Sequence, residues 1–436
     1  MNTFFRKNLI LFSLCLLSGC QQSDSDKQAG IPSIDVINNL GNYQNIPLSE
    51  FVSEVEYIPL ETNDDCLMGG ISCLLVTPTH IFIESFIASD YIISAESKTR
   101  CYAFSRNGRF IGEIGRVGQG PGEYQRIVDL TIDEKKQLLY IETPITLLEY
   151  TYDGVFRRSI RKPKSMNEQP ISEVAFLNDN LFIGHCANHI GNEPYNFFLF
   201  NDSGRVIKTF NNYIKFERIS GSGWSIGEKS IRPFRVSESI YVKVYANDTL
   251  YFLNEQNELT PRFVFDLGKY SVQEKRGGPI NSLSDFYIPN VLKHMVGTPD
   301  YIFFSVSTSL SANIPHPKGR IVIGQDGREE QGLQIPLGIY DMANNKTRLL
   351  ETDPVSRLTG LINDIDGGFS FWPKYYSSAN ELIDVLQVYA MKEILTEKYF
   401  AAHEIKDPQA HQKLKELLKN LEFDDNPVIV IAKLKK

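Results

Sequence analysis

Short apolar runs separated by polar turn residues recur along this chain, and one hairpin pattern repeats in it. The first copy starts at Phe104 and places glycine at +4 (Gly108), an aromatic residue at +6 (Phe110) and isoleucine at +10 (Ile114). Asn107 and Gly108 separate two apolar runs, and glycine adopts the positive φ of a tight hairpin turn at little cost. Each copy therefore predicts a strand, a tight turn, a second strand and a crossover.

Further copies follow at intervals of about 50 residues, starting at Tyr150, Phe200 and Leu253. In the last of these Asn257 replaces the glycine, which is sensible because asparagine tolerates the left-handed conformation. A weaker copy starts at Tyr340, with Asn344 at +4 and Lys346 at +6. One propeller blade of four strands takes roughly 40 to 50 residues, so the repeat predicts an all-β propeller. The alternative is a β-sandwich whose hairpins match by coincidence.

The two ends of the chain predict how the propeller closes. Val55–Leu60 reads as a strand entering the domain, and Val428–Ile431 reads as a lone final strand. Two such strands in one blade leave no open sheet edge. Counting that blade, we expect a six-bladed β-propeller with four-stranded blades, closed by N- and C-terminal strands.

The spacing of apolar residues changes from 2 to 3.6 before the last strand. Four side chains fall near one face of a helix that begins at about Asn380: Leu382, Leu386, Tyr389 and Ile394. Asp407 and Pro408 suit the N-cap and first position of a second helix. We therefore expect a small C-terminal helical insertion at about 380–421. Just before it, Gly360–Pro373 predicts a strand pair joined at an Asp-Gly turn.

Residues 1–19 predict a lipoprotein signal peptide. Arg6 and Lys7 precede the apolar run Leu9–Leu17, which is too short to span a bilayer. The run ends in Leu-Ser-Gly-Cys20, which resembles the bacterial lipobox and implies acylation of Cys20. The alternative is an ordinary signal peptide in which Cys20 is incidental.

Residues 20–30 are polar and acidic and predict a lipidated tether. Acidic residues directly after the cysteine resemble the export signal of surface lipoproteins of Bacteroidota, although a plain linker would look the same. We expect an outer membrane lipoprotein on the periplasmic or cell-surface face. Residues 31–436 would then form the propeller, anchored to the membrane through lipid.

The net charge bears on which partners the protein can bind, and the cysteines bear on whether it contains disulfides. The formal net charge is −8, and no basic cluster with interleaved aromatic residues occurs, which argues against nucleic-acid binding. An exported compartment permits disulfides. Cys66 and Cys73 could close a small loop, but we expect buried thiols at the four remaining cysteines, Cys66, Cys73, Cys101 and Cys186.

The crossover after the first hairpin carries a family resemblance. Gly115–Tyr124, followed by a strand, is similar to the NHL repeat signature. Together with the lipobox, the turn at 247–251 and the closing segment 424–431, it resembles the six-bladed β-propeller lipoproteins of Bacteroidota. The chain departs from this pattern at Glu142, where aspartate is common, and in the insertion at 311–338. The resemblance implies the fold and an exported location, and it assigns no activity.

Metal-binding patterns are incomplete. His185, Cys186 and His189 supply too few ligands for a typical site on their own. Asp364 and Asp366 faintly resemble a calcium loop but lack its closing glutamate, so a hairpin turn explains them better. We expect no cofactor, with Ca²⁺ as the alternative.

The sequence points to a binding role more than to catalysis. Glycines in the crossover at 115–124 could approach a ligand closely, although such glycines more often only turn the chain between blades. Tryptophans could stack on sugars, although a role in the core or between blades is the commoner one. The candidate ligand-binding residues are Arg116, Gln119, Glu123, Tyr124, Arg126, Trp224 and Trp372. We expect a monomeric, non-enzymatic module for a glycan, peptide or protein partner. The alternative is a hydrolase or lyase with a channel metal such as Ca²⁺.

Overall fold

The computed structural model describes residues 30–86, 99–188, 191–217, 230–236, 239–244, 247–268, 291–307, 317, 321–323, 329–331 and 335–435. The chain divides into two units, Met1–Ile31 and Pro32–Lys436. All helices and strands described below belong to the second unit. Cys20, His189 and Trp224 lie outside the described residues.

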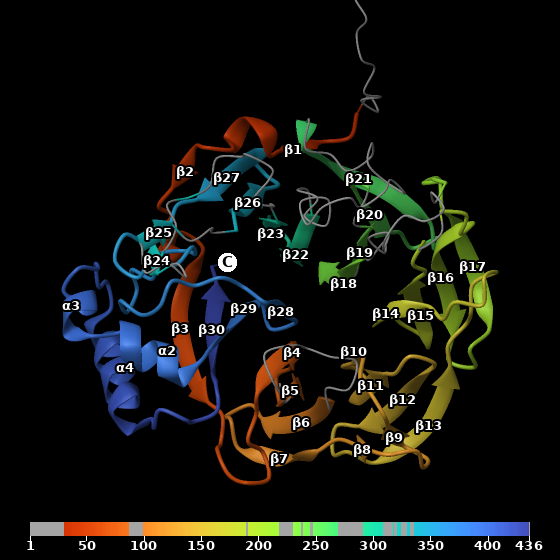
Figure 1. Ribbon diagram of the computed structural model, residues 1–436, viewed down its shortest axis with the longest axis horizontal. Helices are drawn as coiled ribbons and strands as arrows, with labels where there is room; N and C mark the ends of the chain where they lie inside the picture. The colour runs from red at the N-terminus through yellow and green to blue at the C-terminus, as the bar shows by residue number, and fades with distance from the viewer. Residues whose placement is uncertain are drawn as a thin grey trace, which may run out of the picture. The chain divides into compact units, whose positions relative to one another are not determined.

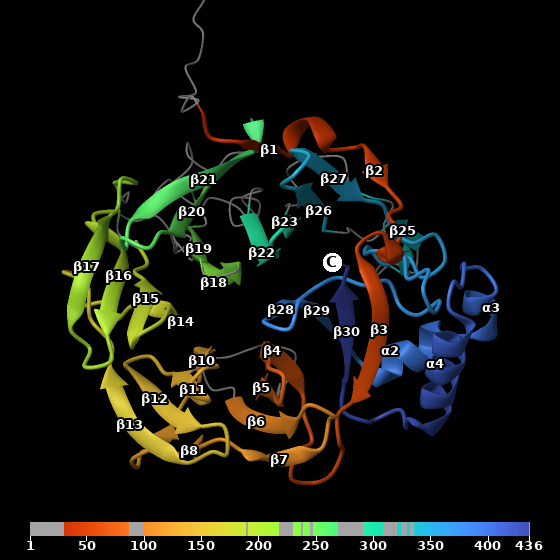
Figure 2. The same cartoon turned by 180° about the vertical axis from the view of Figure 1, so that it is seen from behind.

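Six antiparallel sheets surround a central axis (Figures 1 and 2). The first three blades are formed by strands that follow one another in the sequence. Blade 1 contains β4 (Gly70–Val76), β5 (His80–Phe86), β6 (Thr99–Ser105) and β7 (Phe110–Glu113). Blade 2 contains β10 (Asp129–Asp133), β11 (Leu138–Glu142), β12 (Thr146–Thr151) and β13 (Phe156–Arg161). Blade 3 contains β14 (Ser172–Phe176), β15 (Leu181–His185), β16 (Tyr195–Asn201) and β17 (Val206–Asn211).

The other three blades include strands from the ends of the chain. Blade 4 contains β18 (Ser230–Val236), β19 (Ser239–Val244), β20 (Thr249–Leu253) and β21 (Leu259–Asp266). Blade 5 contains β22 (Val291–Gly297), β23 (Tyr301–Ser307), β26 (Leu337–Asp341) and β27 (Lys346–Leu350), with the small pair β24 (Ile321–Ile323) and β25 (Glu329–Gln331) inserted between β23 and β26. Blade 6 contains β28 (Tyr375–Ser377), β29 (Glu381–Leu386), β30 (Val428–Leu434) and β3 (Val52–Pro59).

The ring is closed on its inner side. The innermost strands contact one another in the order β4, β10, β14, β18, β22 and β28, and β28 contacts β4 again. Six hydrophobic clusters correspond to the six interfaces between neighbouring blades. Both faces of most blades are thus buried, which favours continuous apolar runs in the strands over strict alternation. The structure is a six-bladed β-propeller, as the repeat predicted.

The hairpin pattern marks the turn between the third and fourth strand of blades 1 to 5. Gly108, Gly154, Gly204 and Asn257 all have positive φ, and each hairpin has a register shift typical of a bulge. The prediction for the fifth copy was wrong by one residue. There the positive φ belongs to Asn345, at +5, and the strands pair without a register shift. In the other hairpins the bulge takes up one residue of the strand. Here there is no bulge, so that residue lies in the turn, which is one residue longer.

Blade 6 joins both ends of the chain. The C-terminal strand β30 pairs with β29 on one side and with the N-terminal strand β3 on the other, both antiparallel. The predicted closure is therefore confirmed. The same N-terminal segment also adds short parallel strands to two other blades, which the sequence did not predict: β1 (Ser33–Asp35) pairs with β21, and β2 (Tyr43–Gln44) pairs with β27.

The helical insertion is shorter than predicted. Residues 381–386 form β29 instead of the start of a helix, because β30 and β28 pair with them on both sides. The helices are α2 (Val388–Ile394), α3 (Glu397–Phe400) and α4 (Pro408–Asn420). They lie outside β3 at the perimeter of blade 6 (Figures 1 and 2) and share a hydrophobic cluster with β30. Asp407 caps α4 as predicted, accepting hydrogen bonds from the backbone N–H groups of Gln409 and Ala410.

The segment 360–373 does not form the predicted strand pair. Only single bridges occur in it, between Leu361 and Phe371 and between Pro47 and Ile362. Gly367 provides the predicted turn with φ of 73°. The side chains of this segment are mostly buried against the helical insertion and blade 5, so its conformation depends on those contacts and not on a ladder. Among the described residues, no helix is long and apolar enough to cross a membrane.

Candidate functional site

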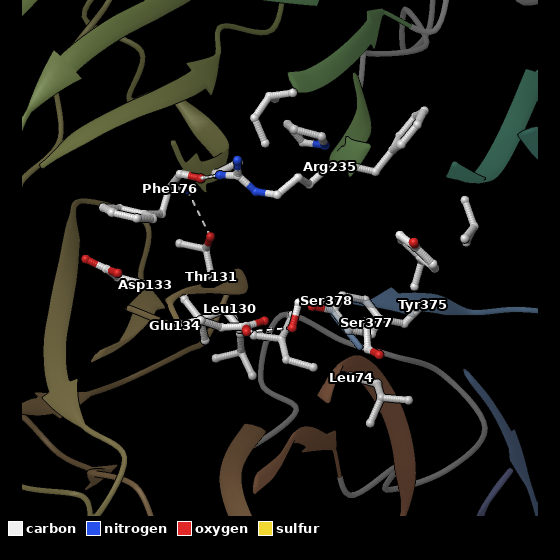
Figure 3. Close-up of a pocket in the computed structure, with 18 of the residues that line it drawn as sticks. Leu74, Leu130, Thr131, Asp133, Glu134, Phe176, Arg235, Tyr375, Ser377 and Ser378 are labelled. Atoms are coloured by element: carbon white, nitrogen blue, oxygen red, sulfur yellow. Dashed lines mark hydrogen bonds between the residues drawn. The ribbon is translucent and has the colours of Figure 1, made fainter. Parts of the chain in front are cut away.

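A cavity of about 1030 Å³ lies where the innermost strands of all six blades converge. This is slightly above the range of roughly 300–1,000 Å³ of most small-molecule sites. Figure 3 shows Phe176 and Arg235 on one side of the cavity and Tyr375, Ser377 and Ser378 on the other. The cavity is therefore the axial channel of the propeller, and it draws residues from every blade.

The wall of the cavity is mainly apolar. Aliphatic side chains such as Leu74, Leu130 and Val296 come from the middle of the innermost strands. In the described part of the chain, four aromatic rings also line it: Phe176, Phe234, Tyr375 and Tyr376.

Two of these rings rest on tyrosines. Phe176 stacks on Tyr140 with ring centroids 5.8 Å apart, and Phe234 stacks on Tyr241 at 5.4 Å. The supporting tyrosines belong to second strands, one in the neighbouring blade and one in the same blade. The rings that reach the cavity are therefore held in place by the layer behind them.

One hydrogen bond joins two blades beside the cavity, at the end formed by turns. Ser378 Oγ, in the turn after β28, donates to Glu134 Oε2, in the turn after β10, at 2.7 Å. These turns belong to blades 6 and 2, and β4 of blade 1 lies between them and contacts both inner strands. The bond thus ties two non-adjacent blades together beside the channel.

The basic residues near this end interact with protein groups. Arg235 donates to the carbonyl oxygens of Phe176 and Leu177 at 3.2 and 2.6 Å. Lys136 Nζ lies 2.6 Å from Asn180 Oδ1, and it is 3.8 Å from a carboxylate oxygen of Asp133. These contacts join blade 3 to blades 4 and 2, so they hold the inner strands together.

The inner edge of β14 is also covered by neighbouring side chains. The backbone N–H of Phe176 donates to Thr131 Oγ1 at 2.9 Å, and that of Val174 donates to Glu142 Oε2 at 2.8 Å. Because Arg235 covers the carbonyl oxygen of Phe176, donors and acceptors on this edge are already engaged.

A second polar cluster lies between the helical insertion and the segment 351–374. Asp353 and His403 are buried, with His403 Nε2 3.1 Å from Asp353 Oδ2 and Nδ1 2.8 Å from the carbonyl oxygen of Tyr399. Both partners only accept hydrogen bonds when Asp353 is ionised, so both imidazole nitrogens must donate. The hydrogen bond to Asp353 raises the pKa of His403, and burial opposes it. Both the hydrogen-bond geometry and the direction of the pKa shift favour the protonated form of His403.

Two further aspartates in this segment face the helical insertion. Burial alone would raise the pKa of Asp364, but hydrogen bonds from Lys406 and Ser49 hold it below its usual value. Burial raises the pKa of Asp366 to about 6, although hydrogen bonds from Gly368 and Tyr57 oppose this. Asp366 Oδ2 has no hydrogen-bond partner among the described residues. These contacts dock the insertion on blade 6 and lie apart from the channel.

The predicted crossover residues lie at the perimeter between blades 1 and 2. Arg116 in β8 (Arg116–Val117) is paired with Glu123 in β9 (Glu123–Tyr124) at 2.6 Å, and Glu123 also accepts from the N–H of Gly120. Gln119 and Arg126 are exposed beside them. None of the crossover residues lines the cavity. Their similarity to the NHL signature stays a prediction.

The two other described candidates behave as core residues. Tyr124 is 2% exposed, and its hydroxyl accepts a hydrogen bond from the N–H of Cys101. Trp372 is 6% exposed and packs edge-on against Phe303 at the interface of blades 5 and 6. The placement of Trp372 favours the packing interpretation that the sequence had left open for the tryptophans. Tyr124, which was expected to bind a ligand, is buried in the core instead.

The described residues contain no disulfide; Cys66, Cys73, Cys101 and Cys186 are all buried. His185 is buried with Nδ1 3.6 Å from Glu173. Within the described part of the chain, no three His, Cys, Asp or Glu side chains are grouped for a metal ion. Asp364, one of the two aspartates of the calcium-like pattern, is paired with Lys406 at 2.6 Å.

Sequence reasoning missed the channel residues. Thr131, Glu134 and Phe176 lie on or just after the first strand of a blade, that is, the strand after each crossover. The signal that could have found them is this position within the repeat. The crossover glycines are the more conspicuous feature of the sequence, but they lie at the rim of the propeller.

Comparison with known proteins places the fold in context. A protein of Bacteroides fragilis described as a "putative exported protein" is 17% identical, with a TM-score of 0.61 over 90% of this chain and 98% of that one. A member of the DUF4221 family from Bacteroides vulgatus is 11% identical, with a TM-score of 0.49 over 88% and 98%. The first similarity confirms the shared propeller fold.

No curated protein matches the sequence. Residues 31–433 match the family described as "Domain of unknown function (DUF4934)". The match spans the propeller from the segment before β1 to the final strand β30. The chain therefore belongs to the DUF4934 family.

Proposed function

We propose that this protein is an exported, lipid-anchored binding module that holds a glycan, a peptide or a segment of a partner protein in its axial channel. The observation that carries the proposal is the cavity of about 1030 Å³, lined by aliphatic side chains and four aromatic rings with polar groups at its end. Binding sites are typically concave and mostly apolar with a few polar groups that orient the ligand.

The location rests on separate support. Leu17-Ser-Gly-Cys20 follows a short apolar run, and a propeller of the same fold is described as a "putative exported protein". Several acyl chains on one cysteine anchor a protein durably, since each buried CH₂ contributes about 0.8 kcal/mol. Mass spectrometry of the protein from its native host would test this: an acylated N-terminal Cys20 supports the anchor, and an unmodified residue 20 refutes it.

The proposed binding site in the channel can be tested by a substitution that fills the channel with a large side chain. Ser72 lies on β4, is exposed and lines the cavity, so Ser72→Trp adds an indole without disturbing a buried contact. Ser53 on the outermost strand β3 is a matched control, because it too is an exposed serine at a register shift. The soluble chain from Gln21 is screened on glycan and peptide arrays. Signals that Ser72→Trp abolishes and Ser53→Trp retains support the proposal; signals that both variants retain contradict a channel site.

A further inference from the structure

We infer that the ligand of the channel is a neutral oligosaccharide, an inference that rests on the proposed binding function. The cavity is slightly larger than a typical small-molecule site, which suits an oligomer better than a single sugar. Three features of the wall favour this class of ligand: the pairing of its charged groups, the hydrogen bonding of its backbone edge, and the side chains that can contact a ligand.

The charged groups of the wall either form hydrogen bonds with other protein groups or are balanced by a charge of opposite sign nearby. Glu134 accepts from Ser378, Lys136 contacts Asn180 and Asp133, and Arg235 covers two carbonyl oxygens. A ligand that carried net charge would have to displace these contacts, at the cost of leaving protein groups without partners.

The remaining charged residues of the wall are exposed. Lys135 and Asp179 lie in exposed turns and have opposite signs. The positive charge of Lys374 lowers the pKa of the buried Asp384, against the larger opposite effect of burial. Among the described residues of the wall, no cluster of one sign forms, as an acidic or basic ligand would require.

The backbone edge of β14 disfavours an extended peptide on that side of the channel. Peptides that bind in extended form commonly add a strand to an open sheet edge through main-chain hydrogen bonds. On β14, the N–H groups of Val174 and Phe176 donate to Glu142 and Thr131, and the carbonyl oxygen of Phe176 accepts from Arg235. This edge, which carries one of the four rings of the cavity, has no room for an added strand.

What remains for a ligand is a set of rings and small polar groups. Tyr375 lies across the channel from Phe176 (Figure 3). Tyr376, Ser72 and Asn178 also line the cavity and supply a ring, a hydroxyl and an amide. Sugars combine apolar C–H faces with hydroxyl groups and carry no charge when neutral. Aromatic rings provide flat apolar faces for the C–H side, and hydroxyls and amides both donate and accept hydrogen bonds.

The test is calorimetric titration of the chain from Gln21 with uncharged tetrasaccharides (cellotetraose, maltotetraose, mannotetraose), tetragalacturonate and a pool of tetrapeptides. We expect an uncharged tetrasaccharide to bind at least tenfold more tightly than tetragalacturonate or the peptides. Ser72→Trp should abolish that binding and Ser53→Trp should leave it unchanged. Tyr375→Leu, which removes a ring but keeps an apolar side chain, should weaken binding about 2- to 10-fold. Tyr389→Leu, on the exposed face of α2, is its control.

The other outcomes separate the two proposals. Binding of tetragalacturonate or a peptide that Ser72→Trp abolishes would overturn the neutral-sugar inference and leave the channel as a binding site. Failure of all probes to bind, or binding that Ser72→Trp does not affect, would overturn both. A tetrasaccharide that binds equally well to Tyr375→Leu would overturn the role of the ring and, with it, the stacking argument for sugars.

Discussion

A buried ion pair between blades 2 and 3 gives the sharpest stability prediction. Lys162 Nζ lies 2.6 Å from Glu142 Oε1, and the two side chains are 1% and 0% exposed. The second carboxylate oxygen of Glu142 accepts from the N–H of Val174 in blade 3. Burial raises the pKa of Glu142 and lowers that of Lys162, and in each case the partner opposes the shift without cancelling it. The charge of neither residue therefore makes a net favourable contribution to the free energy of unfolding.

This balance predicts a large cost for removing one partner and a small cost for removing both. Lys162→Met leaves an uncompensated buried carboxylate, which costs about 3–5 kcal/mol of unfolding free energy. Adding Glu142→Gln removes the second charge and keeps an amide oxygen for the N–H of Val174. The double variant should recover much of the loss, with a coupling of roughly 1–3 kcal/mol between the two sites.

Urea unfolding at pH 7, followed by circular dichroism, measures these free energies. Lys164→Met is the control, since its partner Glu168 is 79% exposed and the pair should contribute less than about 1 kcal/mol. A cost below about 1 kcal/mol for Lys162→Met would refute the reasoning, because it would mean that water reaches the carboxylate. A double variant no more stable than Lys162→Met would refute it as well.

Three further outcomes follow from local features. Because the pKa of His403 is raised in the folded state, protonation of this residue stabilises the fold fully at pH values below 6.5, the ordinary pKa of histidine. The melting temperature should therefore fall as pH rises through the raised pKa. His403→Gln or Asp353→Asn should flatten this profile between pH 6 and 9. Gly204 has φ of 78° and an added Cβ would lie 2.4 Å from the carbonyl oxygen of Arg161, so Gly204→Ala should cost at least about 1–2 kcal/mol, whereas Gly112→Ala, with open space around it, should cost far less; urea unfolding compares them. Thiol titration should find little reaction in the native chain from Gln21 and full reaction after unfolding, at Cys66, Cys73, Cys101 and Cys186.

The hairpins could be predicted because their signal is local. Glycine or asparagine at +4 determines whether the backbone can adopt positive φ, and this depends on no distant contact. Where the prediction was off by a residue, at Asn344 and Asn345, two asparagines compete for one turn and both tolerate that conformation. The register of the strands then decided between them.

The helix boundary near 380 could not be predicted from the spacing of apolar residues. Leu382 and Leu386 fit one face of a helix, but residues 381–386 form the second strand of blade 6 because β30 returns from the C-terminus to pair with them. A short apolar run is ambiguous between a buried strand and a helix until its neighbours are known. Here the neighbour is more than forty residues away along the chain.

The sequence by itself determined the repeat, the turns, the cap of α4 and the closure by both chain ends, since each of these depends on residues close together or on the chain's own ends. Only the tertiary structure decided what lines the channel. Thr131, Phe176 and Tyr375 are far apart in the sequence and meet because six blades bring their first strands to one axis. The same applies to the Arg116–Glu123 crossover: its glycines are conspicuous along the chain, but packing places it at the rim. Local chemistry selects each turn, whereas a site made from six separate strands exists only once the ring has closed.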